Sequence, residues 1–309
     1  MKISSKGNFR FRMNTDLHVG ASISQQLPEL IRSKGFENPY IILDHNLLKN
    51  KEVDSIIKNL EDSFNSKIFV CKVAEPDYDY LDFAKLEISS NSMDCLIAIG
   101  GGSVMDLSKG LAVLLKNEGP AINFKGFPKD IRHPIPVITV PTLAGTGSEI
   151  AYNAVFTDSK KRMRLGINTE LNYPVLSVID SKLTLTAPKN PVLFGILDCL
   201  NHIVEGYISP NASSFTKEIS KSAFTLWYKS VNGHINDFHS INSREEMYLA
   251  SILANMALNN VGSGLGGDFS YPLGAKFSVP HGLGEGIFLP YLYRLYVDRG
   301  FEGFSGLFD

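Results

Sequence analysis

The chain has 309 residues, of which 30 are lysine or arginine and 32 are aspartate or glutamate, giving a formal net charge of −2. This near balance excludes the basic footprint of a nucleic-acid-binding protein. The length allows one very large domain or two ordinary ones. The cysteines Cys71, Cys95 and Cys199 are scattered and show no disulfide framework, which favours a reducing compartment.

The N-terminal sequence lacks the apolar stretch of a signal peptide. No apolar run approaches the roughly 20 residues that a membrane-spanning helix needs. We therefore expect a cytoplasmic protein with no membrane segment and no nucleic-acid partner. The expected assembly is a homodimer, because dimers are the commonest oligomers.

Up to about residue 188, short apolar runs alternate with helical patterns. This alternation favours βαβ units and a mainly parallel sheet. The expected strands are 40–43, 68–73, 95–99 and 137–140, and the expected helices are 24–33, 53–64, 80–89 and 104–115.

The patterning changes after the segment Pro188-Lys-Asn-Pro191. Pro191 at a first helical position, with Asn190 as its cap, predicts a helix that runs towards Ser209. Strand patterns largely disappear from there on. Further helices are expected at about 214–230 and 244–259.

Two domains follow from this change. The sequence predicts an α/β domain over residues 1–188 and a helical domain over residues 189–309. A ligand site is expected in a cleft between two such domains.

The segment Cys95–Lys109 carries the strongest indication of a ligand. A buried strand pattern stops at Gly100-Gly-Gly-Ser103, and a helical pattern follows at once. Such a junction combines exposed backbone N–H groups with the positive end of a helix dipole, which suits a phosphate or pyrophosphate. Ser103 would also serve as an N-cap without any ligand, and glycines can be present for the geometry of the turn alone.

A second loop, Val140–Glu149, directly follows a predicted strand. Its small and hydroxylated residues make a tight loop rich in hydrogen-bond donors, which suits contact with the ribose or phosphates of a nucleotide. A polar connecting loop is the alternative interpretation.

In the first helix of the predicted helical domain, Asp198 and His202 lie four residues apart and share a face, with Glu205 on the same side. Their neighbours are mostly apolar, so the helix is expected to be buried. A buried carboxylate and imidazole must be paired or coordinate something. Aspartate oxygen and histidine nitrogen suit zinc or ferrous iron, and an ordinary Asp–His pair is the alternative.

His281 lies in a loop that leads into a helix. Pro280 and Gly282 flank it and could fix the direction of its imidazole. From its own segment, His281 is equally consistent with a metal ligand and with a helix-entry residue.

Together these segments resemble the iron-containing, or group III, alcohol dehydrogenase family, a relative of glycerol dehydrogenases and dehydroquinate synthases. The resemblance extends from about Phe11 to Tyr296. It rests on four motifs in order: Gly100–Lys109, Pro141–Glu149, Asp198–Glu205 and Pro280–Gly282. The implied fold is a Rossmann-like parallel-sheet domain followed by an all-helical domain, as in dehydroquinate synthase, with a shorter C-terminal part than usual.

The resemblance implies an NAD(P)(H)-dependent alcohol dehydrogenase or aldehyde reductase in which Fe²⁺ or Zn²⁺ polarises the substrate oxygen. The implied catalytic residues are Asp106 and Tyr271. A carboxylate at Asp44 favours NAD(H), because it repels the 2′-phosphate of NADP(H). The implied metal ligands are Asp198, His202 and His281, and the implied cofactor-binding residues are Asp44, Gly101, Gly102, Ser103, Asp106, Thr142 and Thr146.

Some positions depart from the family pattern. The family's remaining metal ligand is a histidine fourteen residues before His281, where this chain has Gly267. The adjacent Asp268 could substitute, or three protein ligands and water could hold the metal. Tyr271 stands where the family has a histidine linked to proton transfer. Arg164 replaces a common lysine and keeps its charge.

Two other functions remain open. Gly267 and the short C-terminal part favour a nucleotide-binding, catalytically impaired relative. A lyase of the dehydroquinate-synthase type is less favoured, because Glu149 and the Asp198/His202 helix follow the alcohol dehydrogenase pattern.

The expected substrate is a small alcohol or aldehyde. The segment Ser270–Leu273 resembles branches that act on sugar-acid or phosphonate aldehydes, so an anionic aldehyde is a candidate. Fewer C-terminal helices would leave apolar surface exposed, which favours self-association.

Overall fold

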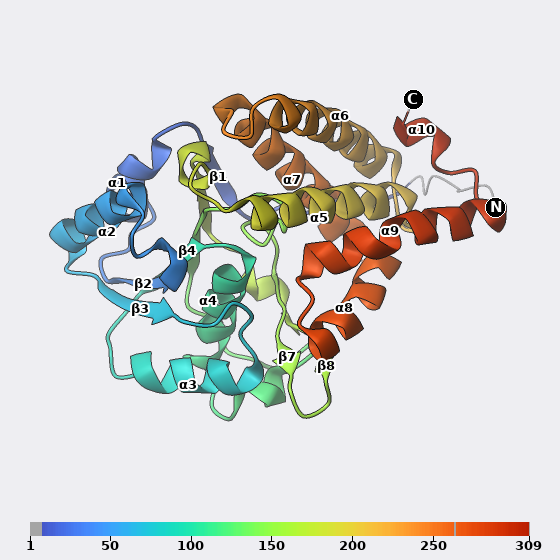
Figure 1. The fold of residues 1–309 in the computed structure, drawn as a ribbon. Helices are drawn as coiled ribbons and strands as arrows, with labels where there is room; N and C mark the ends of the chain where they lie inside the picture. Colours follow the sequence, from blue (N-terminus) through green and yellow to red (C-terminus); the bar gives the residue numbers. More distant parts are fainter. Residues whose placement is uncertain (1–7, 263, 309) are drawn as a thin grey trace. The chain divides into compact units, whose positions relative to one another are not determined.

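The computed structural model describes residues 8–262 and 264–308, and these residues form two compact units (Figure 1). An α/β unit comprises residues 14–143 and 148–186. A helical unit comprises the described residues of 187–308 together with two short segments, 8–13 and 144–147. The sequence prediction had placed both short segments in the first domain.

The α/β unit is built on a six-stranded sheet in the order β1-β10-β5-β4-β2-β3, and every strand pair in it is parallel. The strands are β1 (Asp16–Val19), β2 (Pro39–Asp44), β3 (Lys67–Cys71), β4 (Cys95–Gly100), β5 (Val137–Pro141) and β10 (Leu176–Ile179). The four central strands are mostly apolar because helices cover both faces of the sheet.

Two helices cover each face of this sheet. Ile41 and Leu43 of β2 pack with α1 (Leu27–Ser33) and α2 (Lys51–Phe64). The alternate residues of β2 face the core made with α3 (Tyr78–Ile88) and α4 (Gly102–Leu114). Successive strand residues therefore face opposite helix layers.

The α/β unit also contains shorter elements. Two antiparallel ladders pair β6 (Asn153–Ala154) with β9 (Ile167–Asn168) and β7 (Thr157–Asp158) with β8 (Met163–Arg164). The 3₁₀ turns are η1 (Ile23–Gln26), η2 (His45–Leu47), η3 (Ala121–Phe124), η4 (Glu170–Asn172) and η5 (Ser181–Thr184).

The helical unit contains the remaining helices of the described chain. These are α5 (Lys189–Ile208), α6 (Ser214–Asn236), α7 (Ile241–Val261), α8 (Leu265–Phe277), α9 (His281–Asp298) and α10 (Ser305–Phe308). A capping box between Ser213 and Thr216 begins α6. The predicted fold class, a parallel-sheet α/β domain followed by helices, is confirmed.

Several local predictions need correction. β1 and β10 were not predicted, and the first part of the predicted helix 24–33 is the 3₁₀ turn η1. The N-cap of α4 is Gly101 and not Ser103, because the N–H groups of Val104 and Met105 donate to Gly101 O. Likewise α5 begins before Pro191.

In α5, Pro188 is the N-cap, and Val192 N donates to Pro188 O. The predicted cap Asn190 is therefore inside the first turn. Proline is tolerated there because the first helical N–H groups need no intrahelical acceptor.

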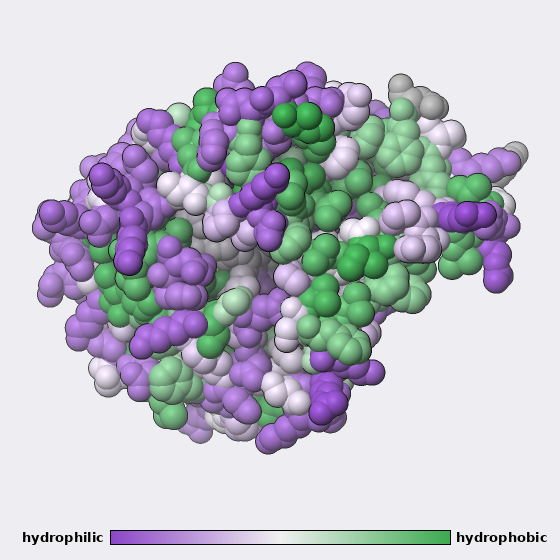
Figure 2. Space-filling model, viewed as in Figure 1, coloured by the Kyte–Doolittle hydropathy of each residue, from purple (hydrophilic) through white to green (hydrophobic). Residues whose placement is uncertain are grey.

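Within the described residues, no helix is long and apolar enough to span a bilayer. Apolar side chains nevertheless gather on the visible surface of α8 and α9 (Figure 2). The exposed ones include Phe269, Phe277, Ile287, Tyr291 and Leu295. This surface matches the expectation of exposed apolar area.

Candidate functional site

The candidate site of the α/β unit lies where the strand order of the sheet reverses. β3 lies beside one edge of β2 and β4 beside the other, so β2 and β4 flank a topological switch point. Ligands of open α/β sheets bind beyond the carboxyl ends of such strands. Asp44 ends β2, and a Cβ built on Gly100 at the end of β4 would lie 3.1 Å from the Asp44 Cβ.

Asp44 keeps one carboxylate oxygen available at this point. Its Oδ1 accepts from the backbone N of Asn46 at 2.9 Å and from Asn46 Nδ2 at 3.0 Å. Its Oδ2 has no hydrogen-bond partner among the described residues. A carboxylate held by one oxygen and open at the other can accept from a ribose hydroxyl.

The N-terminus of α4 provides the adjacent donors. No described atom lies within 4 Å of where a Cβ on Gly101 would be. The first N–H groups of a helix have no intrahelical acceptor and concentrate positive partial charge. Gly102 and Ser103 occupy these first positions of α4 and are only partly buried, so the end of α4 can receive an anion.

Asp106, predicted to be a cofactor-binding and catalytic residue, is engaged within the α/β unit. Its Oδ1 accepts from Ser148 Oγ at 2.6 Å, and its Oδ2 accepts from Val155 N at 2.9 Å. Lys109 Nζ lies 3.4 Å from Oδ1 and donates to Ser148 Oγ at 2.6 Å. Complete burial lowers the pKa of Lys109, although Asp106 opposes this shift. This Lys109–Ser148–Asp106 network was missed by the sequence analysis.

The loop after β5 is divided between the two units. Thr142 is buried in the α/β unit, where its N–H donates to Gly100 O at 3.0 Å. Thr146 belongs to the segment 144–147 of the helical unit. There Gly145 N donates to Ser251 Oγ at 3.1 Å, and Gly147, at φ +63°, leaves no room for a Cβ beside Asn255. The two threonines therefore belong to different units.

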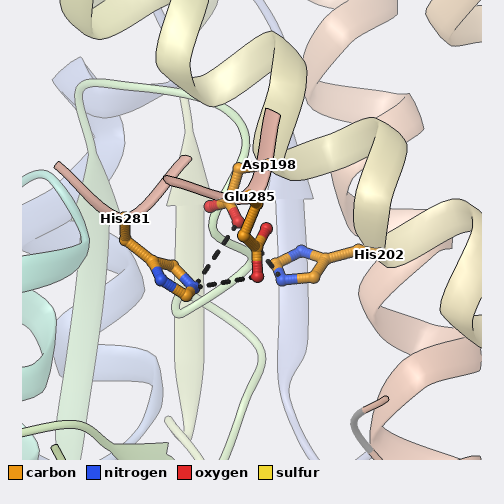
Figure 3. A group of neighbouring side chains, drawn as sticks. All are labelled: Asp198, His202, His281 and Glu285. Atoms are coloured by element: carbon orange, nitrogen blue, oxygen red, sulfur yellow. Dashed lines mark ion pairs between the residues drawn. The ribbon is translucent and has the colours of Figure 1, made fainter. Parts of the chain in front are cut away.

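The helical unit has a candidate site of its own, a cluster of four buried or half-buried side chains (Figure 3). Asp198 and His202 come from successive turns of α5, and His281 and Glu285 from successive turns of α9. One ligand atom from each of the four lies within 4.8 Å of the others. We call these residues the four-residue cluster.

The distances within the four-residue cluster are short. His202 Nε2 lies 3.4 Å from Asp198 Oδ1, and His281 Nε2 lies 3.8 Å from the same oxygen. His281 Nε2 also lies 3.2 Å from Glu285 Oε1. Asp198 Oδ1 and Glu285 Oε2 are buried without a hydrogen-bond partner among the described residues. Two buried carboxyl groups beside two imidazole nitrogens fit a divalent cation.

The Nδ1 atoms of both imidazoles, which point away from the cluster, contact polar side chains. Asn255 Nδ2 lies 3.3 Å from His202 Nδ1, and Ser270 Oγ lies 3.0 Å from His281 Nδ1. Because the Ser270 hydroxyl donates to Gly267 O at 3.1 Å, it accepts from His281 Nδ1–H. The Nε2 lone pair of His281 then faces the cluster, which is the tautomer a metal ligand needs.

Burial and charge act in opposite directions on the two carboxyl groups. Burial works to raise the pKa of Asp198, but His202 and His281 outweigh it and hold that pKa below its usual value. Burial raises the pKa of Glu285 well above its usual value, and the Asp198 and Glu205 carboxylates add to the rise. The two imidazoles thus supply too little positive charge to balance the two carboxyl groups of the four-residue cluster.

The structure brings the three predicted metal ligands together, and the other candidates lie elsewhere. Asp268 is exposed and outside the cluster, so the suggestion that it replaces the missing histidine is wrong. The Glu205 carboxylate accepts from Gly264 N at 2.9 Å and Gly266 N at 2.8 Å. Arg164 pairs with Glu75 inside the α/β unit.

Tyr271 lies beside the cluster. Its ring stacks on that of His281 at 5.2 Å between centroids and 21° between planes.

Glu285 was missed by the sequence analysis. The available signal was its position four residues after His281, one turn along the same helix.

Two family models match this chain. The model of iron-containing alcohol dehydrogenase matches residues 14–181, more than half of the chain. The model of the C-terminal part of the Fe-containing alcohol dehydrogenase family matches residues 193–305.

Individual proteins agree with these models. The chain is similar to alcohol dehydrogenase 4 of Schizosaccharomyces pombe, with 26% identity over 265 residues covering 85% of this chain and 63% of that protein. It is similar to the NAD-dependent methanol dehydrogenase of Bacillus methanolicus, with 25% identity over 280 residues covering 89% of this chain and 72% of that enzyme. The chain therefore spans less than two thirds of the fission yeast protein.

The fold has a close counterpart among solved structures. The alcohol dehydrogenase from Oenococcus oeni superposes with a TM-score of 0.90 at 26% identity, over 96% of this chain and 79% of that one. Since the two consecutive family models cover the α/β unit and most of the helical unit, this chain belongs to the iron-containing alcohol dehydrogenase family.

Proposed function

We propose that this chain is an NAD(H)-linked alcohol dehydrogenase or aldehyde reductase with a metal-assisted site. The observation that carries the proposal is the four-residue cluster, which offers two carboxylates and two inward-facing imidazole nitrogens at one point. Family membership and the similarity to an NAD-dependent methanol dehydrogenase support the reaction class.

Asp198, His202 and His281 are the proposed holders of the metal. A divalent cation bound there would act as a Lewis acid on the substrate oxygen, and either Fe²⁺ or Zn²⁺ suits these donors. The chain's own contribution is positioning, since Ser270 holds the His281 ring and Asn255 contacts the His202 ring.

The proposed proton-transfer group is Tyr271. Its ring is stacked on His281, and a phenol can donate a proton to a substrate oxygen during reduction. For Asp106 we propose positioning in place of catalysis, because both of its carboxylate oxygens already accept hydrogen bonds within the α/β unit.

The proposed cofactor site comprises Asp44, Gly101, Gly102, Ser103, Thr142 and Thr146. The open N-terminus of α4 supports pyrophosphate binding, and the free oxygen of Asp44 supports a ribose contact. A carboxylate at this strand end favours NAD(H) over NADP(H).

The proposed substrate is a small alcohol or aldehyde, with anionic aldehydes included because of the Ser270–Leu273 segment. We also propose a homodimer, which the exposed apolar side chains of α8 and α9 support. Sedimentation velocity of the purified protein tests the assembly.

Turnover tests the proposed function. Protein loaded with Fe²⁺ or Zn²⁺ is expected to consume NADH with at least one member of a panel of neutral and anionic aldehydes. Asp198→Ala is expected to lower kcat/KM by about 100-fold or more, since Lewis-acid assistance contributes several kcal/mol. Asp268→Asn, an exposed carboxylate outside the cluster, is the matched control and should retain activity.

Two results would contradict the proposal. An unchanged rate in Asp198→Ala would remove the metal from the reaction. NADH binding without turnover on any aldehyde would indicate a nucleotide-binding protein without this catalysis.

A further inference from the structure

Position 267 supplies no side chain to the four-residue cluster. Gly267 is buried in α8, and the atom nearest to a Cβ built there is Tyr271 Cζ, 3.7 Å away. The Tyr271 ring, one turn further along α8, therefore occupies the space beside Gly267 and continues onto the face of His281. Asp268 is exposed and is not among the four residues of the cluster.

Glu285 supplies a donor from a different helix. It is 2% exposed and lies one turn after His281 on α9. Its Oε1 lies 3.2 Å from His281 Nε2, and its Oε2 has no hydrogen-bond partner in the described part of the chain. A carboxyl group buried in this way is costly unless something compensates for it.

The carboxyl groups near Glu285 increase the cost of burying it. Asp198 also has a buried oxygen without a hydrogen-bond partner, and Glu205 is buried as well. In the described residues, no lysine or arginine forms an ion pair with Asp198 or Glu285. Two close carboxyl groups with only two imidazoles around them are best compensated by a divalent cation.

The four ligand atoms lie near one point. The separations are 3.4 Å for His202–Asp198, 3.2 Å for His281–Glu285 and 3.8 Å for His281–Asp198. All four ligand atoms lie within 4.8 Å of one another. Glu285 Oε1 therefore belongs to the same group of donor atoms as the three proposed ligands.

We propose that Glu285 is the fourth protein ligand of the metal centre, in place of the histidine that the family has at position 267. This inference rests on the proposed metal site of Asp198, His202 and His281. The centre then has two carboxylates and two imidazoles. Position 267 still contributes through its backbone, because Gly267 O accepts the Ser270 hydroxyl that orients His281.

Direct metal binding tests this assignment without any assay of activity. Co²⁺ is titrated into the full chain, and the absorbance of bound Co²⁺ reports its donor set. Trp227 is the only tryptophan. Its Nε1 donates to Ile196 O on α5 at 2.8 Å, near Asp198, so its fluorescence gives an independent binding signal.

Glu285→Gln keeps the shape of the side chain and removes the charge. We expect its Co²⁺ affinity to fall by about 100-fold and its Co²⁺ spectrum to change, since a ligand is lost. The metal-free variant should melt no lower than metal-free wild type, because a buried acidic group has been removed. Asp268→Asn should bind Co²⁺ as wild type does. Unchanged affinity and spectrum in Glu285→Gln would overturn the assignment.

Asp198→Ala and the wild-type protein separate the possible failures. If Asp198→Ala loses Co²⁺ while Glu285→Gln does not, Glu285 is not a ligand and a three-ligand centre remains. If wild-type protein binds no Co²⁺, both the assignment and the proposed metal site fail.

Discussion

The two units build their candidate sites in different ways. In the α/β unit, the proposed nucleotide-binding features are the end of β4, the backbone at the start of α4 and one carboxylate at the end of β2. In the helical unit, the four-residue cluster consists entirely of side chains, two from α5 and two from α9. A backbone site depends on the conformation of one loop, whereas a side-chain site depends on how two helices pack.

This difference determines which substitutions each part tolerates. The packing of α9 against α5 relies on glycines, since a Cβ on Gly282 would lie 2.1 Å from Phe194 O and one on Gly286 would lie 2.5 Å from Leu197 Cδ1. At Gly101 the same addition meets no described atom within 4 Å. Gly282 and Gly286 therefore serve helix packing, whereas Gly101 leaves the space that the proposed ligand needs.

Gly282→Ala is expected to give the largest effect. The added methyl group forces α9 away from α5, which should lower the free energy of unfolding of the helical unit by about 3 kcal/mol and weaken Co²⁺ binding. Denaturation followed by Trp227 fluorescence measures this, and NADH affinity should change little. Gly267→Ala is the matched control, because its Cβ makes only an ordinary contact at 3.7 Å. Equal stability of the two variants would show that the packing of α9 against α5 does not depend on Gly282.

Gly101→Val is expected to weaken NADH binding and to leave stability unchanged. Its side chain has space in the protein but stands at the proposed pyrophosphate position, so the Kd for NADH should rise by about tenfold or more with unchanged stability. Calorimetric titration measures the affinity. Gly20→Val, which also places its Cβ in open space, should bind NADH normally. Weakened binding in both variants would show that the effect is not local to α4.

Asp44→Asn tests the one side chain of the proposed nucleotide site in the α/β unit that is expected to contact the ribose. Removal of the charge should shift the ratio of NADH to NADPH affinity by about tenfold towards NADPH, because the repulsion of a 2′-phosphate is lost. Competitive binding of the two cofactors measures the ratio. A ratio that stays the same would mean that Asp44 does not contact the ribose.

The sequence predicted the contiguous features better than the assembled ones. The strand–glycine–helix junction at 95–114 could be predicted because strand, turn and helix follow one another along the chain. β10 was missed although three of the four residues of Leu176–Ile179 are apolar, since four residues give little periodicity. The half-exposed β1 has no such run.

Packing decided the features that could not be predicted. Glu285 has no motif of its own, and only the approach of α9 to α5 places it beside Asp198. Similarly, Gly145 and Gly147 lie in a loop of the α/β sequence but pack against α5 and α7. Spacing along the chain carries no information about such contacts.

The division of the chain also has a consequence for folding order. The α/β unit is complete once residue 186 has been synthesised, because all of its segments precede that point. The helical unit must recruit two earlier segments, and the backbone of Arg12 exchanges two hydrogen bonds with the side chain of Asn260, 248 residues away. Contacts between residues so far apart in the sequence form slowly. Some of the first described residues to leave the ribosome are thus among the last to find their partners.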